Sequence, residues 1–468
     1  MNQYKKLLSN TLIFGIGTFS SKILVFLLMP IYTRILSPAD FNVADLIIQT
    51  ANLIIPITAV CIAEAVIRFG LESSNRKADV FSCGILTVLI GFAALLVFYP
   101  LVDLIPYTKG YTILIYLFVL ASSLKGVCAQ FVRTKGYVRL YAFDGIFSTV
   151  LVLTFIILGL VVFKLGIIGY VLATILSDLI SALFLTWVAG LWRYFKIKGI
   201  QKGLWKAMLL YSVPLIPNTI FYWITNVSDR YIVTAVLGPE VNGLYAIAYK
   251  IPTVITAVST IFMQAWQLSA FTETDQRVKE RFYTTVFDAY QSVLFLIGAG
   301  TILLIQPLTR LLVDTKYYES WRYVPLLIIA VVFSCFATFF SSIYMSEKRN
   351  TMTMITTFTG AALNIGLNFL LIPTALGANG AAIATFASYF AVFLFRCIHS
   401  RKYIAVEVKW LRLVINLVLI LLEAVIMMLQ LKYWIVFEIA ITVIILLVNA
   451  KTLITALLKL FERRKHAA

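Results

Sequence analysis

The sequence predicts an all-α polytopic membrane protein with about fourteen transmembrane helices. Hydrophobic residues make up 61% of the chain, and the mean hydropathy is +0.94. Such a chain is too apolar to be soluble, because too few polar groups remain to cover its surface. Apolar stretches near the ~20 residues that a spanning helix needs recur along its length. Two motifs also occur twice.

The repeated motifs divide the chain into two corresponding halves. Residues 36–39 (Leu-Ser-Pro-Ala) return 201 positions later as 237–240 (Leu-Gly-Pro-Glu), and residues 165–177 return 211 positions later as 376–388. Six apolar segments separate corresponding points, and an even number of crossings gives both halves one direction across the membrane. The halves are therefore predicted to be parallel repeats about an axis along the membrane normal, an architecture of secondary transporters.

The predicted spans follow one another with no loop longer than roughly twenty residues. The first is a span and not a cleavable signal, because the apolar run from Thr11 to Ile31 is too long and no small-residue cleavage site follows. The spans run roughly 10–31, 44–67, 80–104, 111–131, 143–163, 167–191, 209–237, 241–267, 282–305, 324–344, 352–372, 379–398, 411–429 and 433–457.

The spans group into four parts. Residues 1–191 are a first six-helix bundle, and 207–398 are a second. Between them, 192–206 is a basic amphipathic cytoplasmic linker, whose charges and aromatic residues are typical of a helix bound to anionic lipid. Residues 399–468 hold two appended helices, numbers 13 and 14, and a basic cytoplasmic tail.

The basic residues predict the topology. Most of the 39 Lys and Arg lie in alternate loops, so the net charge of +18 indicates an oriented membrane protein and not a nucleic-acid partner. Arg396, near the end of the predicted span 379–398, is counted with the residues of the more basic side. By the positive-inside rule that side is cytoplasmic and holds both termini.

Several enzyme and metal-protein classes are disfavoured. The five cysteines have no CxxC spacing, and the two histidines lie in basic segments, so neither a disulfide nor a metal site is expected. The sequence has no P-loop, HExxH, GxSxG or DxD motif. We therefore expect neither an ATP-driven pump nor an enzyme, and no catalytic residue.

Charged side chains inside the spans are the first functional candidates, because each costs several kcal/mol at the bilayer centre. Lys22 lies twelve residues past Asn10, about 18 Å along a helix and hence near the midplane. Lys250 lies eleven residues past Pro239 and reaches a similar depth from the other side. Two ammonium groups at one level suit a polyanion, and a ligand phosphate or diphosphate is the natural counter-charge.

Structural alternatives exist for the basic residues. Lys22 could instead extend to the interface or pair with Asp45 or Glu64. Arg68 could contact the substrate or pair with Glu64, four residues before it on one helix. Lys125 lies nearer the cytoplasmic end, where extension to the interface is the common outcome.

Other polar residues extend the predicted substrate site. Gln49 is the repeat counterpart of Lys250, which indicates that both positions face a wet cavity. Arg230 follows Asp229, and adjacent helical residues do not face each other, so the two need different partners. Arg34 is an outer-rim residue.

Four acids remain within the spans. They are Asp178, Asp288, Glu423 and Glu438. Each could carry a proton or have a structural partner, and the sequence does not rank them.

Several motifs together resemble one family. They are the run GAALNIGLNFLLIP at 360–373 with LGANGAAIAT at 376–385, YTRILSP at 32–38, Asp229-Arg230-Tyr231, and the segment 237–252. This combination resembles bacterial polysaccharide-biosynthesis flippases, the Wzx-type exporters of the multidrug/oligosaccharidyl-lipid/polysaccharide superfamily. The resemblance covers roughly residues 5–400.

The resemblance implies two six-helix bundles around a central cavity that opens alternately to each side. It implies an undecaprenyl-diphosphate-linked oligosaccharide, moved from the cytoplasmic to the outer leaflet of the bacterial inner membrane and usually driven by proton or sodium entry. Related lipid II flippases place basic residues in helices 1, 2 and 8. Lys22 and Lys250 resemble two of these, whereas Gln49 stands in helix 2, which disfavours a lipid II role.

The resemblance also indicates a cation site in the second half. Asn364 and Asn368 are four residues apart, so two amide oxygens share one helix face as neutral hard ligands. Asp229 would supply the charge and Thr385 a hydroxyl. These positions look like a sodium site of lipid II flippases, with Asn368 in place of a carboxylate. Alternatively, the amides hydrogen-bond across packed helices.

The sequence therefore predicts a flippase for the lipid-linked repeat unit of a capsule, exopolysaccharide or O-antigen. Its expected partners are that glycolipid, the bilayer, and neighbouring glycan synthesis and polymerase proteins, with Na+ or H+ as the coupling ion and no other cofactor. The alternatives are a cation-coupled multidrug antiporter, for which an acidic cavity is expected, a lipid II flippase, and a membrane glycan polymerase or ligase.

Overall fold

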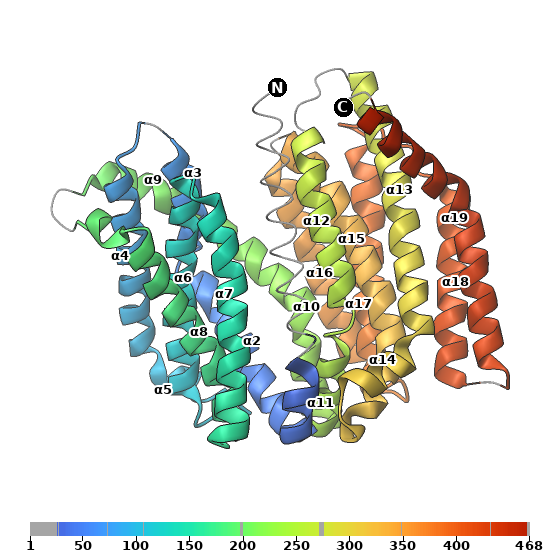
Figure 1. Cartoon of the computed structure of the whole chain (residues 1–468), viewed down its shortest axis with the longest axis horizontal. Coiled ribbons are helices and arrows are strands. Elements are labelled where there is room, and N and C mark those ends of the chain that lie inside the picture. The colour runs from blue at the N-terminus through green and yellow to red at the C-terminus, as the bar shows by residue number, and fades with distance from the viewer. Residues whose placement is uncertain are drawn as a thin grey trace. The chain divides into compact units, whose positions relative to one another are not determined.

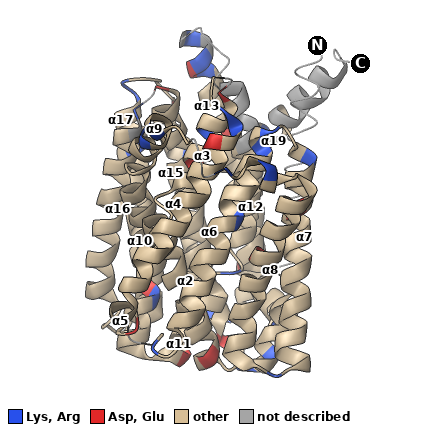
Figure 2. Cartoon of the chain, turned by 90° about the vertical axis from the view of Figure 1, so that its left-hand side faces the viewer, with Lys and Arg blue, Asp and Glu red and all other residues tan. Residues whose placement is uncertain are grey.

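A computed structural model of the chain describes residues 26, 28–72, 74–105, 107–196, 200–270, 276–347, 349–430 and 432–465. Every regular element within these residues is a helix, which confirms the predicted fold class (Figure 1). Charged residues lie mainly near the helix ends, with few along the helices (Figure 2). The chain is a multi-pass membrane protein.

The predicted spans from residue 44 onward correspond to helices. Twelve described helices are long and apolar enough to cross a membrane, or thirteen when the bent pair α11 and α12 counts as one span. The first predicted span, 10–31, lies largely outside the described residues. The total of fourteen therefore stays a prediction.

The chain divides into two compact units, Met1–Gly243 and Leu244–Ala468. The division predicted from the repeats, at the linker 192–206, concerns the halves of the sequence and stays a prediction. The helices of the first unit are α2 (Pro38–Thr58), α3 (Ile62–Leu71), α4 (Lys77–Val97), α5 (Tyr99–Val102), α6 (Thr112–Thr134), α7 (Val138–Ile156), the π-helix η1 (Ile157–Val162), α8 (Gly166–Val188), η2 (Leu191–Tyr194), α9 (Lys202–Ser212) and α10 (Leu215–Leu237).

The helix α15 is central to the second unit. Its most apolar stretch is 83% buried, against 22% for α19, so α15 is enclosed by protein while α19 faces lipid. It packs against α12, α13, α16, α17 and α18. After α11 (Pro239–Ala248), the helices are α12 (Thr253–Ala270), α13 (Gln276–Leu303), α14 (Ile305–Leu312), η3 (Thr315–Tyr323), α15 (Val324–Ser346), α16 (Asn350–Leu371), α17 (Ala378–Ser400), α18 (Trp410–Leu429) and α19 (Trp434–Lys465).

The shorter repeated motif starts a helix in each half. Ser37 and Asp40 form a capping box at the start of α2, in which Ser37 Oγ accepts from the Asp40 N–H at 3.1 Å and Asp40 Oδ2 accepts from the Ser37 N–H at 3.3 Å. Pro38 occupies the first helical position, where its missing N–H costs nothing. In the second copy Gly238 adopts a left-handed φ of +94° before Pro239 begins α11.

The longer repeated motif packs helices through two glycines. The first glycine of each copy has a left-handed φ, +57° at Gly166 and +53° at Gly377. The second lies against the backbone of the preceding segment. A Cβ on Gly169 would lie 2.8 Å from the Gly159 carbonyl oxygen, and a Cβ on Gly380 would lie 2.7 Å from that of Leu371. The motif thus recurs because each half turns a helical hairpin with no room for a side chain.

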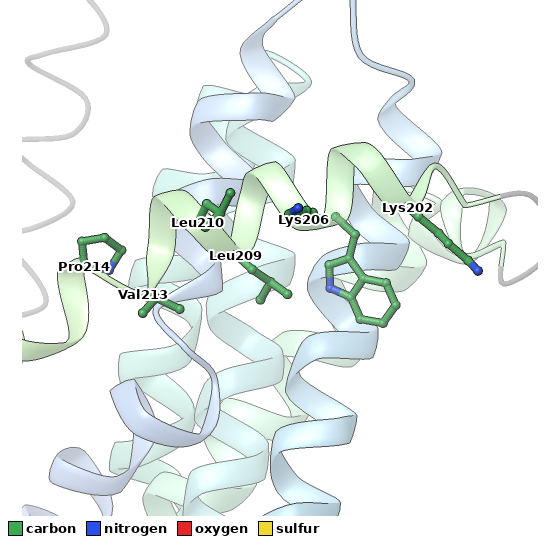
Figure 3. A pocket seen from close by; sticks show the side chains of 7 residues that line it. Lys202, Lys206, Leu209, Leu210, Val213 and Pro214 are labelled. Carbon is green, nitrogen blue, oxygen red and sulfur yellow. The ribbon is translucent and has the colours of Figure 1, made fainter.

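The linker helix α9 has one packed face and one basic face. Leu204 and Met208 are buried where α9 contacts α3 and α4, and Trp205 Nε1 donates to Thr87 Oγ1 at 2.9 Å. The helix also borders an open pocket of about 480 Å³ (Figure 3). The pocket is lined by Lys202, Trp205, Lys206, Leu209, Leu210, Val213 and Pro214.

Gly380→Ala tests the role of the hairpin glycine. The new methyl group would meet the Leu371 carbonyl, so α17 must shift from α16 at a cost of about 1–3 kcal/mol. We expect a lower melting temperature of the purified full-length protein in detergent. Gly366→Ala, on α16 with no atom within 4 Å of its Cβ position, is the matched control. Equal melting temperatures for the two variants would contradict this packing role.

Candidate functional site

A polar cluster joins α2 and α10 within the first unit. Arg230 Nη1 donates to Asp45 Oδ2 at 2.5 Å, and the two side chains are only 8% and 3% exposed. Gln49, one turn after Asp45 on α2, approaches the same carboxylate through its Nε2 at 3.4 Å. The backbone carbonyl of Gln49 accepts a hydrogen bond from Trp223 Nε1 at 3.0 Å. The cluster therefore places one buried cation beside one buried anion.

Of four further residues predicted for the substrate and cation sites, the structure describes three. Arg230 already forms an ion pair with Asp45, and a further contact with substrate stays a prediction. Asp229 is fully buried, and its Oδ1 accepts from the backbone N–H of Arg230 at 2.9 Å. Arg34 is exposed in the helical turn before Ser37. Lys22 lies outside the described residues.

The expected pair of Glu64 with Arg68 is not formed. It is absent from the ion pairs of the described residues, and both side chains are exposed. The Arg68 guanidinium instead lies over the Tyr211 ring, 4.5 Å from its centroid. The physical reason is that α9 packs along α3 and brings an aromatic face to the arginine, which gains a cation–π contact.

Lys250 lies at a break and not within a continuous helix, as the predicted span 241–267 implied. Helix α11 ends at Ala248 and α12 begins at Thr253, with a bend of 40° between them. Pro252 explains the break, because its ring excludes a helical hydrogen bond and disfavours helical geometry in the preceding residue. Lys250 is half-buried there. Interrupted helices of this kind form binding sites in many transporters.

The corresponding helix of the first half is also interrupted. The predicted span 44–67 is divided into α2 and α3, with left-handed φ values of +52° at Val60 and +49° at Cys61. Pro56 lies in the last turn of α2. Prolines were visible in both segments, and hydropathy alone did not reveal the breaks.

Three predicted cation-site residues meet in the second unit. Asn368 Nδ2 donates to Asn364 Oδ1 at 2.9 Å, and Asn364 Nδ2 is 3.3 Å from Thr385 Oγ1. All three side chains are buried. Asn368 Oδ1 has no hydrogen-bond donor among the described residues, which makes it an available ligand atom. Asp229 belongs to the first unit, and its part in this site stays a prediction.

Another group of charges lies in α6, α7 and α8, in which Asp144 is buried and Lys125 and Asp178 are half-buried. Lys125 Nζ donates to Asp178 Oδ1 at 2.8 Å, and Ser122 Oγ donates to Asp178 Oδ2 at 2.5 Å. Asp144 accepts from Ser181 Oγ at 2.5 Å. Asp144 was missed in the sequence because it lies at the edge of its predicted span, where an exposed acid is common. Lys125 therefore has a partner in α8 and is not left to extend to the interface.

Arg396 is a buried charge that the sequence analysis did not identify as buried. It lies within α17, and the structure shows it as only 6% exposed. Its Nε donates to Thr356 Oγ1 at 2.9 Å and its Nη1 to the Ala337 carbonyl at 2.9 Å. The sequence analysis counted Arg396 with the basic residues of the cytoplasmic side, and the neutral acceptors on neighbouring helices that bury it are a product of tertiary packing. The guanidinium thus joins α15, α16 and α17 through neutral acceptors.

The sequence matches one protein family. A profile described as polysaccharide biosynthesis protein matches residues 7–267, more than half of the chain. The chain belongs to this family. Membership confirms the predicted resemblance to Wzx-type flippases and places this polysaccharide biosynthesis protein among membrane transporters. A search of curated protein sequences gives no match.

Solved structures show the same fold for this polysaccharide biosynthesis protein. A MATE transporter in complex with MaL6 is 14% identical, with a TM-score of 0.62, covering 84% of this chain and 96% of its own. An outward-facing multidrug resistance MATE transporter of the MOP superfamily is 15% identical, with a TM-score of 0.58 and coverage of 84% and 94%. A MOP-superfamily transporter from Pyrococcus furiosus, described as having a binding pocket of reverse polarity, is 13% identical, with a TM-score of 0.59 and coverage of 84% and 96%.

Asp45→Asn and Arg230→Gln test the buried ion pair. Each change leaves one uncompensated buried charge, so we expect a loss of about 3–5 kcal/mol and a sharp fall in folded yield. The double variant removes both charges and should fold better than either single. Glu319→Gln, in an exposed pair with Arg322, is the control with little effect. Size-exclusion profiles measure the folded fraction, and a double variant worse than both singles would contradict the pairing.

Proposed function

We propose that this protein is a flippase for an undecaprenyl-diphosphate-linked oligosaccharide, the repeat unit of a capsule, exopolysaccharide or O-antigen. It works in the bacterial inner membrane, with both termini cytoplasmic, and carries the glycolipid from the cytoplasmic to the outer leaflet. The mechanism is ion-coupled alternating access. Other proteins of the pathway assemble and polymerise the glycan, and this protein moves the glycolipid without making or breaking its covalent bonds.

The observation that carries the proposal is the place of Lys250. The residue lies at the break between α11 and α12, inside a segment long and apolar enough to span the membrane. Backbone groups released at such a break, together with an ammonium group, favour a ligand that carries negative charge. The diphosphate of a lipid-linked glycan has this charge. Membership of a polysaccharide biosynthesis family is the reason for proposing that the transported lipid carries a glycan. Lys22, Arg34, Arg230, Gln49 and Arg68 complete the substrate site predicted from the sequence.

The sign of the charge separates this function from multidrug transport. A multidrug antiporter is the second candidate, because several solved structures with this fold are MATE transporters. Organic cations would be repelled by Lys250. The Pyrococcus furiosus transporter with a pocket of reverse polarity offers a precedent for one fold with a changed pocket charge. We therefore favour an anionic substrate.

The proposed coupling ion is sodium, bound at Asn364, Asn368 and Thr385. The Asn368 oxygen without a donor and the neighbouring amide and hydroxyl oxygens are neutral hard ligands. With Asp229 as the predicted charged ligand, the site would hold one negative charge. A single charge suits a monovalent ion better than a divalent one. The rival coupling ion is a proton.

Lys250→Ala and Lys22→Ala test the diphosphate site. Removing one charge-assisted contact costs about 1.5–3 kcal/mol, so transport should fall tenfold or more. Complementation in a flippase-deletion host measures it, at matched protein level. Arg should rescue better than Gln, because the required property is positive charge. Lys202→Ala, on the exposed face of α9, is the control, and full activity of the double alanine variant would refute the site.

Sodium coupling predicts that an inward sodium gradient speeds glycolipid transport in vesicles. Asn368→Leu and Asp229→Asn should each remove that response while leaving glycolipid binding largely intact. Asn226→Leu changes a half-buried asparagine of α10 that is outside the proposed site and should leave the response unchanged. Transport that follows only a pH gradient in sodium-free buffer would exclude the ion site.

A further inference from the structure

Two buried carboxyl groups meet between α18 and α19, the helices appended to the repeats. Glu423 on α18 and Glu438 on α19 are each 0% exposed, and their carboxyl groups lie within hydrogen-bonding reach of each other. Thr442 Oγ1 donates to Glu423 Oε1 at 2.9 Å. Glu423 Oε2 and both oxygens of Glu438 receive no hydrogen bond from any other described group.

No ion pair among the described residues joins either acid to a cation. The helices α13 and α15 pack against the pair, and α15 contains no Lys, Arg, His, Asp or Glu. Among the charged residues of α13, Asp288 lies farthest from the start of the helix. It pairs with Lys409 at 2.7 Å and with Arg412. Arg412 is eleven residues before Glu423, about 16 Å along α18. It is therefore engaged elsewhere and too distant to neutralise a carboxylate here.

Other titratable groups on the packed helices also bond elsewhere. Tyr290 of α13 shares a hydrogen bond of 2.5 Å with Ser259 of α12, and Cys335 of α15 lies beside the same two residues. Farther along α19, Lys451 is exposed. The two glutamates thus form an isolated acid pair in the apolar part of the helix pair.

Two ionised carboxylates cannot share such a place. Each would lose its hydration, and at hydrogen-bonding distance the two would repel strongly without a counter-charge. A single proton removes the repulsion, because a protonated carboxyl donates to its neighbour and only one negative charge remains to be desolvated. The unpartnered oxygens of Glu438 are then the acceptors of that bond.

We propose that Glu423 and Glu438 form a proton-binding site that holds one shared proton inside the membrane. Protons reach the site from the side at which α18 ends and α19 begins, where the two helices lie side by side (Figure 1). Glu438 is four residues after the start of α19 and Glu423 six residues before the end of α18, about 6 and 9 Å from the helix ends. The site is independent of the proposed substrate.

The same helix pair carries a neutral contact that does not titrate. Asn449 Nδ2 donates to Asn416 Oδ1 at 2.8 Å, and Asn416 Nδ2 approaches Asn449 Oδ1 at 3.3 Å. This amide pair lies away from the loop. Loss of the shared proton therefore separates the helices at their loop end, while the amide pair holds the other end together.

Infrared difference spectroscopy on the full-length protein in lipid nanodiscs tests the site. A change from neutral to alkaline buffer should remove a carbonyl band of a protonated carboxyl group in the wild type. The band should be absent from Glu423→Gln/Glu438→Gln, in which neutral amides replace both acids. Asn416→Leu/Asn449→Leu removes the amide pair of the same helices and should keep the band. A band unchanged in the double glutamine variant would overturn the proposal.

Thermal melting against pH gives a second measurement on the same samples. In the folded protein the pair holds a proton that exposed glutamates of the unfolded chain have already lost. The melting temperature should therefore fall as pH rises through the ionisation of the pair, and this fall should be missing from the double glutamine variant. If that variant does not fold, Glu438→Gln alone serves, because Glu423 then has no neighbouring carboxylate and the fall in melting temperature should move to lower pH than in the wild type. A pH-independent stabilisation that requires added sodium would instead show a bound metal ion and overturn the proton site.

Discussion

Charges inside the membrane need partners from within the protein, and this requirement fixes how the helices are joined. The ion pair of Arg230 with Asp45 links positions 185 residues apart, and that of Lys125 with Asp178 links positions 53 apart. Apolar faces give little specificity between helices, because lipid tails solvate them equally well. Polar contacts must therefore choose which helices meet. Removing one partner leaves a buried charge unpaired, which is why each pair constrains its unit so strongly.

Much of the fold could be predicted because its signals are local in the sequence. A span is a continuous apolar run, and a repeat is a recurring string, so neither requires knowledge of packing. The two copies of the longer motif even keep the same physical role, since Gly166 and Gly377 share a left-handed backbone. Partners between helices could not be predicted in the same way. The proposed pair of Glu64 with Arg68 followed a rule for one isolated helix, whereas Tyr211 arrives from α9 through tertiary packing.

The candidate site was predicted in composition more than in geometry. The grouping of Asn364 with Asn368 follows from helical periodicity, and Thr385 joins them across α16 and α17. The depth assigned to Lys250 assumed a straight helix, and the break before Pro252 removes that assumption. Hydropathy averages over a window and cannot register a break, while proline acts on a single hydrogen bond. If the prolines within apolar runs are taken into account, the sequence places Lys250 at a break between two helices.

The polar residues of α18 explain why an appended helix pair can be more than an anchor. Arg412, Asn416 and Glu423 recur at helical spacing, and each meets a polar group of a neighbouring helix. Because apolar contact gives little selectivity between helices in lipid, these polar contacts determine how the two helices pair. Of the two contacts that α18 makes through amides or acids, only the acid pair can change charge. A helix pair with one neutral and one titratable contact can loosen at one end without coming apart.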